Sequence, residues 1–388
     1  MMTFKLNTLS ALVAAGMLLA AGAASAQTIV GGGATLPEPY YKASIFPNVP
    51  GNWSYTGTGS GAGKSAFLAD NPQATSGREF RNETDAARPI WAISQSVHFA
   101  GSDSRLEPAN VNAYNTTLRA TLGPLIQVPV LVTPVTLPFQ RAGVAAVNLT
   151  RDQVCKIFSY HPDARTWGQI TGNGDATAIR VVYRSESSGT TELLSDFLAN
   201  GCSGYGFVRG TVFTQVVAGA VAANGGLPAH WAAREGSSGV QNEVLANEGF
   251  AYLSPSYAFE PTNAAKVATI DGVLPSQATY APAPPSGSAQ NAPVNWVPAY
   301  STPATGYPLV GTTNLLIGQC YKDGIGSGTV GASVKELLNY LINQNPGPDF
   351  IQLPLAWRNA ITTAFLTQSN GLGIGNTSVC ANIGRETF

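Results

Sequence analysis

The stretch IRVVYRSESSGTTELLSDFLANGC, residues 179–202, joins a β-branched apolar run to a helical pattern through a turn of serines and one glycine. In its second half, leucines and a phenylalanine recur at the spacing that places them on one helical face. Thr190 and Glu192 then fall in the first turn, where hydroxyls and acidic side chains are favoured. The stretch therefore predicts a buried strand, a turn at Ser188-Gly189 and an amphipathic helix.

Strand-like and helical patterns also alternate elsewhere in the chain. Further buried strands are predicted by LIQVPVLVTPVTLPF (125–139) and GFAYLSP (249–255). This alternation indicates α/β layers. Residues 275–306 are rich in Pro, Ala and Ser with almost no charge, which predicts a long surface loop. With 388 residues, the chain is long enough for two lobes that each bury a core and leave a cleft between them.

The composition excludes some partners and indicates export. Charged residues make up 11% of the chain and the net charge is −1, so no nucleic-acid partner is expected. The N-terminus carries Lys5, an apolar run over 9–21 and an Ala-Ser-Ala site ending at Ala26, which is typical of a secretory signal. The apolar run is too short to span a membrane. The mature protein is therefore expected in the periplasm or secreted.

Four cysteines lie in the exported part, where an oxidising compartment favours disulfides. They allow three pairings, and closing the two shorter loops joins Cys155 with Cys202 and Cys320 with Cys380. No C-x-x-C spacing occurs, so structural disulfides are favoured over a zinc or redox site.

Three junctions, at 31–43, 57–69 and 183–198, each lead from Gly, Ser or Thr into a helical pattern. A helix N-terminus presents unpaired N–H groups and a partial positive charge, so it can bind phosphate or sulfate. The second junction, GTGSGAGKSAFLA, is out of register for a nucleotide P-loop, because Thr58 stands where the first glycine should be. Lys64, early in this helix, is expected to point to solvent.

A fourth stretch, VHFAGSDSRL (97–106), places Asp103 in a turn after a short apolar strand. Most aspartates in such positions are turn residues or helix caps. By itself, this stretch favours the structural interpretation.

Taken together, these segments resemble the phosphate-binding proteins of ABC phosphate importers and, among them, the DING proteins. The likeness runs from about residue 28 to the C-terminus and is carried by GGGATLP, GTGSGAGKSAF, FAGSDS, VVYRSESSGTTELLSDFL and GYPLVGTTNLL. It departs at residues 28–31, where Thr-Ile-Val-Gly replaces Asp-Ile-Asn-Gly. The resemblance implies an α/β, two-lobed periplasmic-binding-protein (Venus-flytrap) fold, each lobe a mixed sheet flanked by helices. It implies phosphate contacts from Thr35, Leu36, Ser60, Asp103, Arg184, Ser188, Gly189 and Thr190.

The implied ligand suggests a mechanism of selectivity. Asp103 can accept a hydrogen bond from a P–OH group, which sulfate lacks near neutral pH. Facing sulfate, an unpaired buried carboxylate costs several kcal/mol, enough for roughly 10⁴-fold discrimination. Arg184 is suited to a fork-like contact with two phosphate oxygens.

The expected partners are inorganic phosphate and an ABC permease, and the protein is expected to be a monomer without cofactor, metal or catalytic residues. The expected organisation is a signal peptide at 1–26, a first lobe at 27–130 completed by 305–388, and a second lobe at 131–304 that includes the loop 275–304.

Three other functions compete with phosphate binding. A secreted hydrolase is disfavoured by the presence of only three histidines and by the lack of a Gly-x-Ser-x-Gly elbow. A phosphatase is the more serious alternative, because some DING proteins have been associated with that activity; turnover abolished by a chelator would identify it. An extracellular interaction protein could use the Pro/Ala-rich loop and Trp296.

Overall fold

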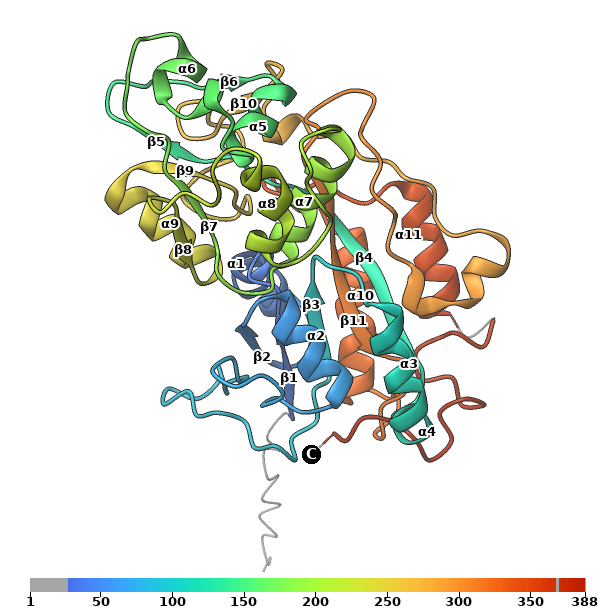
Figure 1. The fold of residues 1–388 in the computed structure, drawn as a ribbon. Coiled ribbons are helices and arrows are strands. Elements are labelled where there is room, and N and C mark those ends of the chain that lie inside the picture. The colour runs from blue at the N-terminus through green and yellow to red at the C-terminus, as the bar shows by residue number, and fades with distance from the viewer. Residues whose placement is uncertain (1–26, 368–369, 388) are drawn as a thin grey trace, which may run out of the picture.

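The computed structural model describes residues 27–367 and 370–387, so the expected signal peptide at 1–26 lies outside the described residues. Two mixed sheets form the centres of two lobes, one above the other in Figure 1, and helices flank both sheets. The α/β, two-lobed fold predicted from the sequence is therefore confirmed.

A five-stranded sheet forms the centre of the first lobe, with the strand order β2-β1-β3-β11-β4. β1 pairs parallel with β2 and β3, whereas β11 pairs antiparallel with β3 and β4, so the sheet is mixed. The strands are β1 (Thr28–Gly33), β2 (Asn52–Gly57), β3 (Phe99–Ser102), β4 (Leu125–Pro134) and β11 (Val310–Gly318).

The helices of the first lobe come from both ends of the chain. The N-terminal ones are α1 (Glu38–Tyr40), α2 (Ser60–Ala69), α3 (Pro108–Thr117) and α4 (Arg119–Leu122). The C-terminal ones are α10 (Val330–Asn343) and α11 (Leu355–Ile361). α2 packs on β1 and β3, and α10 packs on β4, so both ends of the chain cover the same sheet.

The second lobe contains the four-stranded sheet β5-β9-β7-β8 and the two-stranded sheet β10-β6. Its strands are β5 (Phe139–Gln140), β6 (Asn148–Leu149), β7 (Val181–Arg184), β8 (Ala232–Arg234), β9 (Gly249–Ala251) and β10 (Thr269–Ile270). Its helices are α5 (Arg151–Phe158), α6 (Trp167–Thr171), α7 (Gly189–Gly201), α8 (Phe213–Ala222) and α9 (Gly236–Asn247).

The strand, turn and helix predicted over 179–202 are β7 and α7. The side chains predicted for the apolar face of α7 are all buried: Leu193, Leu194, Phe197 and Leu198. β7 is buried along its whole length, which explains why its sequence is a continuous apolar run rather than an alternating one.

β4 and β11 carry the chain between the lobes. They pair antiparallel from Leu125 with Gly318 to Pro134 with Val310, and every residue of both strands is buried. Figure 1 shows these two long strands side by side beneath the second lobe. The next strand after β4, at Phe139, already belongs to the second sheet, so the chain leaves the first sheet just after Pro134.

The Pro/Ala-rich segment 275–306 contains three short 3₁₀ turns and neither α-helix nor strand. Trp296, considered above as a possible partner contact, is buried. Its ring lies 4.7 Å from Phe365 and 6.3 Å from Trp357 in edge-to-face arrangements. The segment therefore covers the region around α11, and Trp296 holds it there rather than facing a partner.

Two disulfides link residues that lie within the same lobe. Cys155 and Cys202 are bonded with their Cα atoms 5.6 Å apart, and Cys320 and Cys380 with theirs 5.2 Å apart. The first joins α5 to the end of α7, and the second joins the segment after β11 to the C-terminal tail.

The C-terminal tail is held by a polar group that we call the C-terminal anchor, made of Asp70, which is partly buried, and of His98 and Arg385, which are fully buried. Arg385 Nη1 donates to Asp70 Oδ1 at 2.7 Å and to Val97 O at 2.6 Å, and the guanidinium lies over the Phe67 ring at 3.8 Å. His98 Nδ1 accepts from the amide of Val30, which leaves Nε2 to donate to the carbonyl of Glu386. These contacts hold the C-terminal tail against β1 and the segment that precedes β3.

Candidate functional site

The first of the three predicted junctions follows β1 and requires glycine. Gly33 has φ +121°, and a Cβ there would lie 2.3 Å from Gly101 O, so only glycine lets β1 and β3 end this close together. Thr35 and Leu36 follow and are both buried. The Leu36 side chain belongs to the core of the first lobe, so its backbone alone can face a ligand.

The second junction is the N-terminus of α2, which is capped by Gly59 with φ 87°. A Cβ on Gly63 would lie 2.4 Å from Gly33 Cα, so glycine at this position lets α2 pack against the end of β1. Ser60 is the first residue of the helix, and its Oγ accepts from the amide of Asp103 at 3.1 Å. The glycines of GTGSGAGKS thus serve close packing around a buried helix N-terminus.

The third junction, at the start of α7, comes from the other lobe. Ser188 caps the helix by accepting from the amide of Thr191 at 3.3 Å. A Cβ on Gly189 would lie 2.4 Å from Ser60 Oγ and 2.6 Å from Asp103 Cβ. The missing side chain therefore allows the two lobes to touch at this point.

Ser60, Asp103, Gly189 and Thr190 form what we call the cleft cluster. Oδ1 of Asp103 and Oγ1 of Thr190 are buried and have no hydrogen-bond partner among the described residues. Because buried polar atoms in folded proteins nearly always have partners, this arrangement fits a tetrahedral anion between the lobes.

Burial raises the pKa of the Asp103 carboxyl to about 7, against the opposing influence of Thr313, Arg184 and Ser60. Near neutral pH, this carboxyl is therefore only partly ionised. Such a group can accept a hydrogen bond from a protonated oxyanion when ionised.

Arg184 lies at the end of β7 and differs from expectation. Its Nε donates to Glu186 Oε1 at 2.7 Å, and Nη2 contacts the same oxygen. Glu186 therefore binds the Nε and Nη2 edge of the guanidinium, which the sequence analysis expected to bind phosphate. Both side chains are almost completely buried. The net charge next to the cleft is therefore smaller than Arg184 alone would give, and the two-oxygen contact expected from Arg184 stays a prediction for the N–H groups that Glu186 does not use.

The structure adds a fourth helix N-terminus that the sequence analysis missed. Ser237, in the first turn of α9, is completely buried and lies 3.0 Å from Thr35 Oγ1 across the cleft. Glu186 Oε1 accepts from the amide of Gly236 at 3.1 Å, which links α9 to Arg184. The sequence signal was present, since EGSSGV (235–240) leads from Gly and Ser into a helical pattern as the other junctions do.

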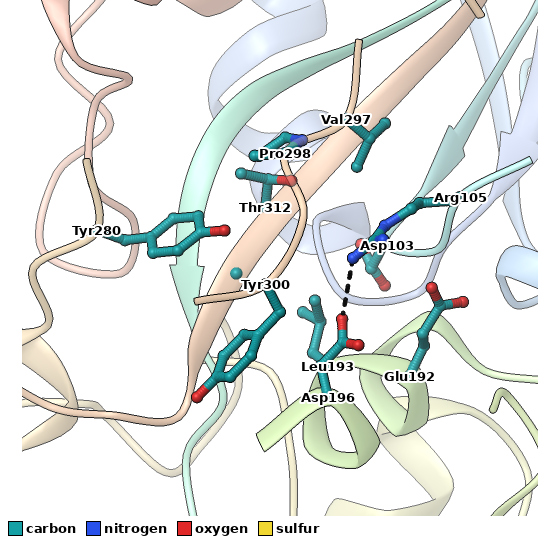
Figure 2. Close-up of a pocket in the computed structure, with 11 residues that line it drawn as sticks. Asp103, Arg105, Glu192, Leu193, Asp196, Tyr280, Val297, Pro298, Tyr300 and Thr312 are labelled. Atoms are coloured by element: carbon teal, nitrogen blue, oxygen red, sulfur yellow. Dashed lines mark hydrogen bonds and ion pairs between the residues drawn. The ribbon is translucent and has the colours of Figure 1, made fainter. Parts of the chain in front are cut away.

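Lys64 does not point to solvent as predicted. Its Nζ donates to the carbonyl of Arg105 at 2.7 Å, and burial lowers the pKa of this lysine. Arg105 in turn reaches Asp196 of α7 at 3.4 Å, the contact drawn in Figure 2. Figure 2 also shows Glu192 beside Asp196 on α7, with Asp103 on the opposite wall of the pocket. Behind the cleft cluster, the two lobes therefore meet through charged side chains.

Within the part of the chain that the structure describes, no group of three or more His, Cys, Asp or Glu side chains could hold a metal ion. No helix among residues 27–367 and 370–387 has the length and apolar character needed to cross a membrane.

Comparisons with known proteins agree on one family. Residues 16–345 match a family model described as a PBP superfamily domain. The chain is 39% identical over 393 residues to alkaline phosphatase L of Pseudomonas aeruginosa, covering 96% of this chain and 98% of that protein. A solved phosphate-binding protein from Stenotrophomonas maltophilia is 36% identical with a TM-score of 0.77, over 92% of this chain and 99% of that one. The phosphate-bound structure of the high-affinity periplasmic phosphate-binding protein PfluDING is 34% identical, also with a TM-score of 0.77 and the same coverage.

Proposed function

The chain belongs to the PBP superfamily and, within it, to the DING-type phosphate-binding proteins, and from this premise we propose that it captures one inorganic phosphate with high affinity in the cleft between its lobes. The observation that carries the proposal is the cleft cluster. Two helix N-termini and a buried carboxylate from opposite lobes converge there, and Asp103 Oδ1 and Thr190 Oγ1 lack partners among the described residues.

The proposed contacts are divided between the lobes. The first lobe supplies Asp103 as an acceptor for P–OH, and donors from the backbone at Leu36 and the hydroxyls of Thr35 and Ser60. The second lobe supplies the start of α7 and the remaining N–H groups of Arg184. The proposed phosphate contacts of the second lobe are Arg184, Ser188, Gly189 and Thr190.

Calorimetry with phosphate and sulfate tests the proposal, after bound anion is removed by unfolding and refolding. We expect one phosphate per chain and far weaker binding of sulfate. Equal affinity for the two anions, or no heat with phosphate, overturns it.

Arg184→Ala provides a second arm of this test. It should weaken phosphate and sulfate together by about 2–5 kcal/mol, because it removes attraction without removing the discriminating carboxylate. Part of this loss will come from Glu186, which the change leaves buried without its partner.

The biological setting forms a finer proposal. We infer that the protein acts in the periplasm or outside the cell as a monomer and delivers phosphate to an ABC permease. The support is the DING-type membership and the periplasmic description of PfluDING. Deletion of the gene should reduce phosphate uptake at low external phosphate, and unchanged uptake would exclude this role.

We also propose that residues 27–130 and 305–388 make one lobe and residues 131–304 the other. The composition of the two sheets supports this division, because strands from both ends of the chain share the first sheet. The pairing of β4 with β11 up to Pro134 favours moving the first crossing a few residues beyond 130.

Phosphatase activity is the second candidate, and the name of the Pseudomonas aeruginosa relative supports it. Turnover of a phosphomonoester by the purified protein, at a rate that phosphate inhibits and Asp103→Asn abolishes, would establish it at the same site. Turnover that survives this substitution would point to a contaminant.

A further inference from the structure

Ser237 touches a predicted phosphate contact in each lobe. Its Oγ lies 3.0 Å from Thr35 Oγ1 in the first lobe, and Arg184 Nη1 donates to the same Oγ at 3.4 Å from the second lobe. Thr35 is separated from Ser237 by 202 positions in the sequence, so only the fold and the approach of the lobes bring them together. Ser237 is also completely buried, so water does not compete for these contacts.

The chemistry of the three groups fixes one of these hydrogen bonds, and the hydroxyl pair of Ser237 and Thr35 can run in either direction. A guanidinium can only donate, so Ser237 Oγ accepts from Arg184. In one of the two arrangements, Ser237 donates its single hydroxyl hydrogen to Thr35 Oγ1. The amide of Ser237 donates to the same Thr35 oxygen at 3.4 Å.

When Ser237 donates through both its hydroxyl and its amide, Thr35 Oγ1 accepts two hydrogen bonds, which uses both of its lone pairs. The hydroxyl hydrogen of Thr35 is left to donate elsewhere. Because Thr35 lies at the cleft, an anion held there is the natural acceptor. The relay from Arg184 through Ser237 thus makes Thr35 a donor rather than an acceptor.

A second contact from the same lobe holds the backbone of Thr35. Tyr257 OH donates to Thr35 O at 2.9 Å. Ser237 and Tyr257 both belong to the second lobe, so they can hydrogen-bond to Thr35 only when the cleft between the lobes is closed. Closure of the lobes therefore also orients the Thr35 hydroxyl.

We propose that Ser237 is a positioning residue for phosphate capture: in the closed protein it turns the Thr35 hydroxyl toward the anion and holds Nη1 of Arg184, without touching the anion itself. This inference rests on the proposed function of the cleft. It adds to that function a residue outside the ligand contacts that controls how long phosphate stays bound.

A double-mutant cycle of Ser237→Ala and Thr35→Val tests the inference, with phosphate affinity measured by calorimetry and dissociation by stopped flow. Ser237→Ala should weaken phosphate binding by about tenfold, the effect of one or two hydrogen bonds. The loss should occur mainly in the dissociation rate. In the Thr35→Val background, the same substitution should cost much less, because the group on which Ser237 acts is gone.

Ser203→Ala is the matched control, because Ser203 is an exposed serine of the same lobe, and it should leave phosphate binding unchanged. If Ser237→Ala costs the same in both backgrounds, Ser237 does not act through Thr35 and the inference is wrong. If Ser237→Ala does not fold, Ser237→Cys replaces it in the cycle, since a thiol is a similar shape and a weak donor. Absence of phosphate binding by the unmodified protein would overturn the proposed function itself, a result distinct from additive losses in the cycle.

Discussion

The C-terminal anchor and the cleft cluster are both buried groups of polar side chains, but they are completed in different ways. In the anchor, the Arg385 guanidinium donates to the Asp70 carboxylate and to backbone carbonyls, and the His98 ring pairs with a backbone amide and a backbone carbonyl. Among the described residues, only Nε of Arg385 lacks a partner in the anchor. In the cleft cluster, Asp103 Oδ1 and Thr190 Oγ1 lack one.

The difference separates stability from binding. A polar group that is satisfied within the chain favours the folded state, because unfolding exchanges good partners for water. A polar group left unsatisfied lowers stability and gains its partner only from a ligand. Substitutions in the anchor should therefore change unfolding, and substitutions in the cleft should change phosphate binding.

The largest effect is expected from Asp103→Asn. The amide can donate to any tetrahedral oxyanion, so the preference for phosphate over sulfate should fall by roughly 10³–10⁴-fold while the protein remains folded. Competition calorimetry measures the ratio. Asp163→Asn, at an exposed carboxylate, is the control. If the ratio does not change, Asp103 is only a turn residue and the selectivity mechanism is wrong.

Next in size is Arg385→Ala. Removing the guanidinium takes one donor from Asp70, which keeps Ser96 and the amide of Val97, and one from each of the Val97 and Phe67 carbonyls, so the free energy of unfolding should fall by about 1–3 kcal/mol. Phosphate affinity of the folded variant should not change. Urea unfolding followed by calorimetry checks both, with exposed Arg119→Ala as the control. A large loss of phosphate affinity would mean that the two regions are coupled.

The pH dependence of stability should have opposite signs in the two regions. Burial raises the pKa of Asp103 from 3.8 to about 7, so between these values the folded protein holds a proton that the unfolded chain has lost. Its contribution to stability therefore decreases as pH rises through this window. Burial lowers the pKa of His98 from 6.5 to about 4, so its contribution decreases as pH falls from 6.5 to 4.

These two slopes oppose each other in the phosphate-free protein, and variants should separate them. Asp103→Asn should remove the loss of stability with rising pH and expose the His98 slope. Urea unfolding at several pH values between 4 and 7.5 measures this. An unchanged slope in Asp103→Asn would show that the carboxyl is already ionised in the folded protein.

The smallest effect is expected from Arg78→Ala. Arg78 pairs with Glu235 across the cleft at 3.0 Å, but the Glu235 side chain is 64% exposed. Such a pair contributes at most about 1 kcal/mol and is screened by salt. Phosphate affinity should therefore fall only slightly, and less so at high salt. Arg88→Ala breaks a comparable pair with Glu83 within the first lobe and should not affect phosphate affinity.

The sequence predicted those parts of the fold and site that depend on local pattern. The apolar face of α7 and the glycines at the start of α2 can be recognised from short runs of neighbouring residues. The turn that carries Asp103 follows a short strand, as its local sequence predicts. Long-range partners could not be read in this way. No local pattern links Ser237 to Thr35, because 202 positions separate them.

Two contacts that the sequence did not reveal have the same physical origin. Lys64 was expected in solvent because its position in the helix says nothing about the carbonyl of Arg105, 41 positions away. Arg184 was expected to offer its fork to phosphate, although Glu186 stands only two positions later. An acidic neighbour at that distance in the sequence can point to either face of the chain, and only the fold shows that it reaches the guanidinium.

The place of β11 in the first sheet has a consequence for the order in which the chain can fold. β11 lies between β3 and β4 and is the only strand, among those described, that bonds to β4. Until residue 310 has emerged, β4 has no neighbour and the sheet begun by β1, β2 and β3 cannot close. Completion of the first lobe must therefore wait for the last fifth of the polypeptide, a delay that high contact order imposes on folding rate.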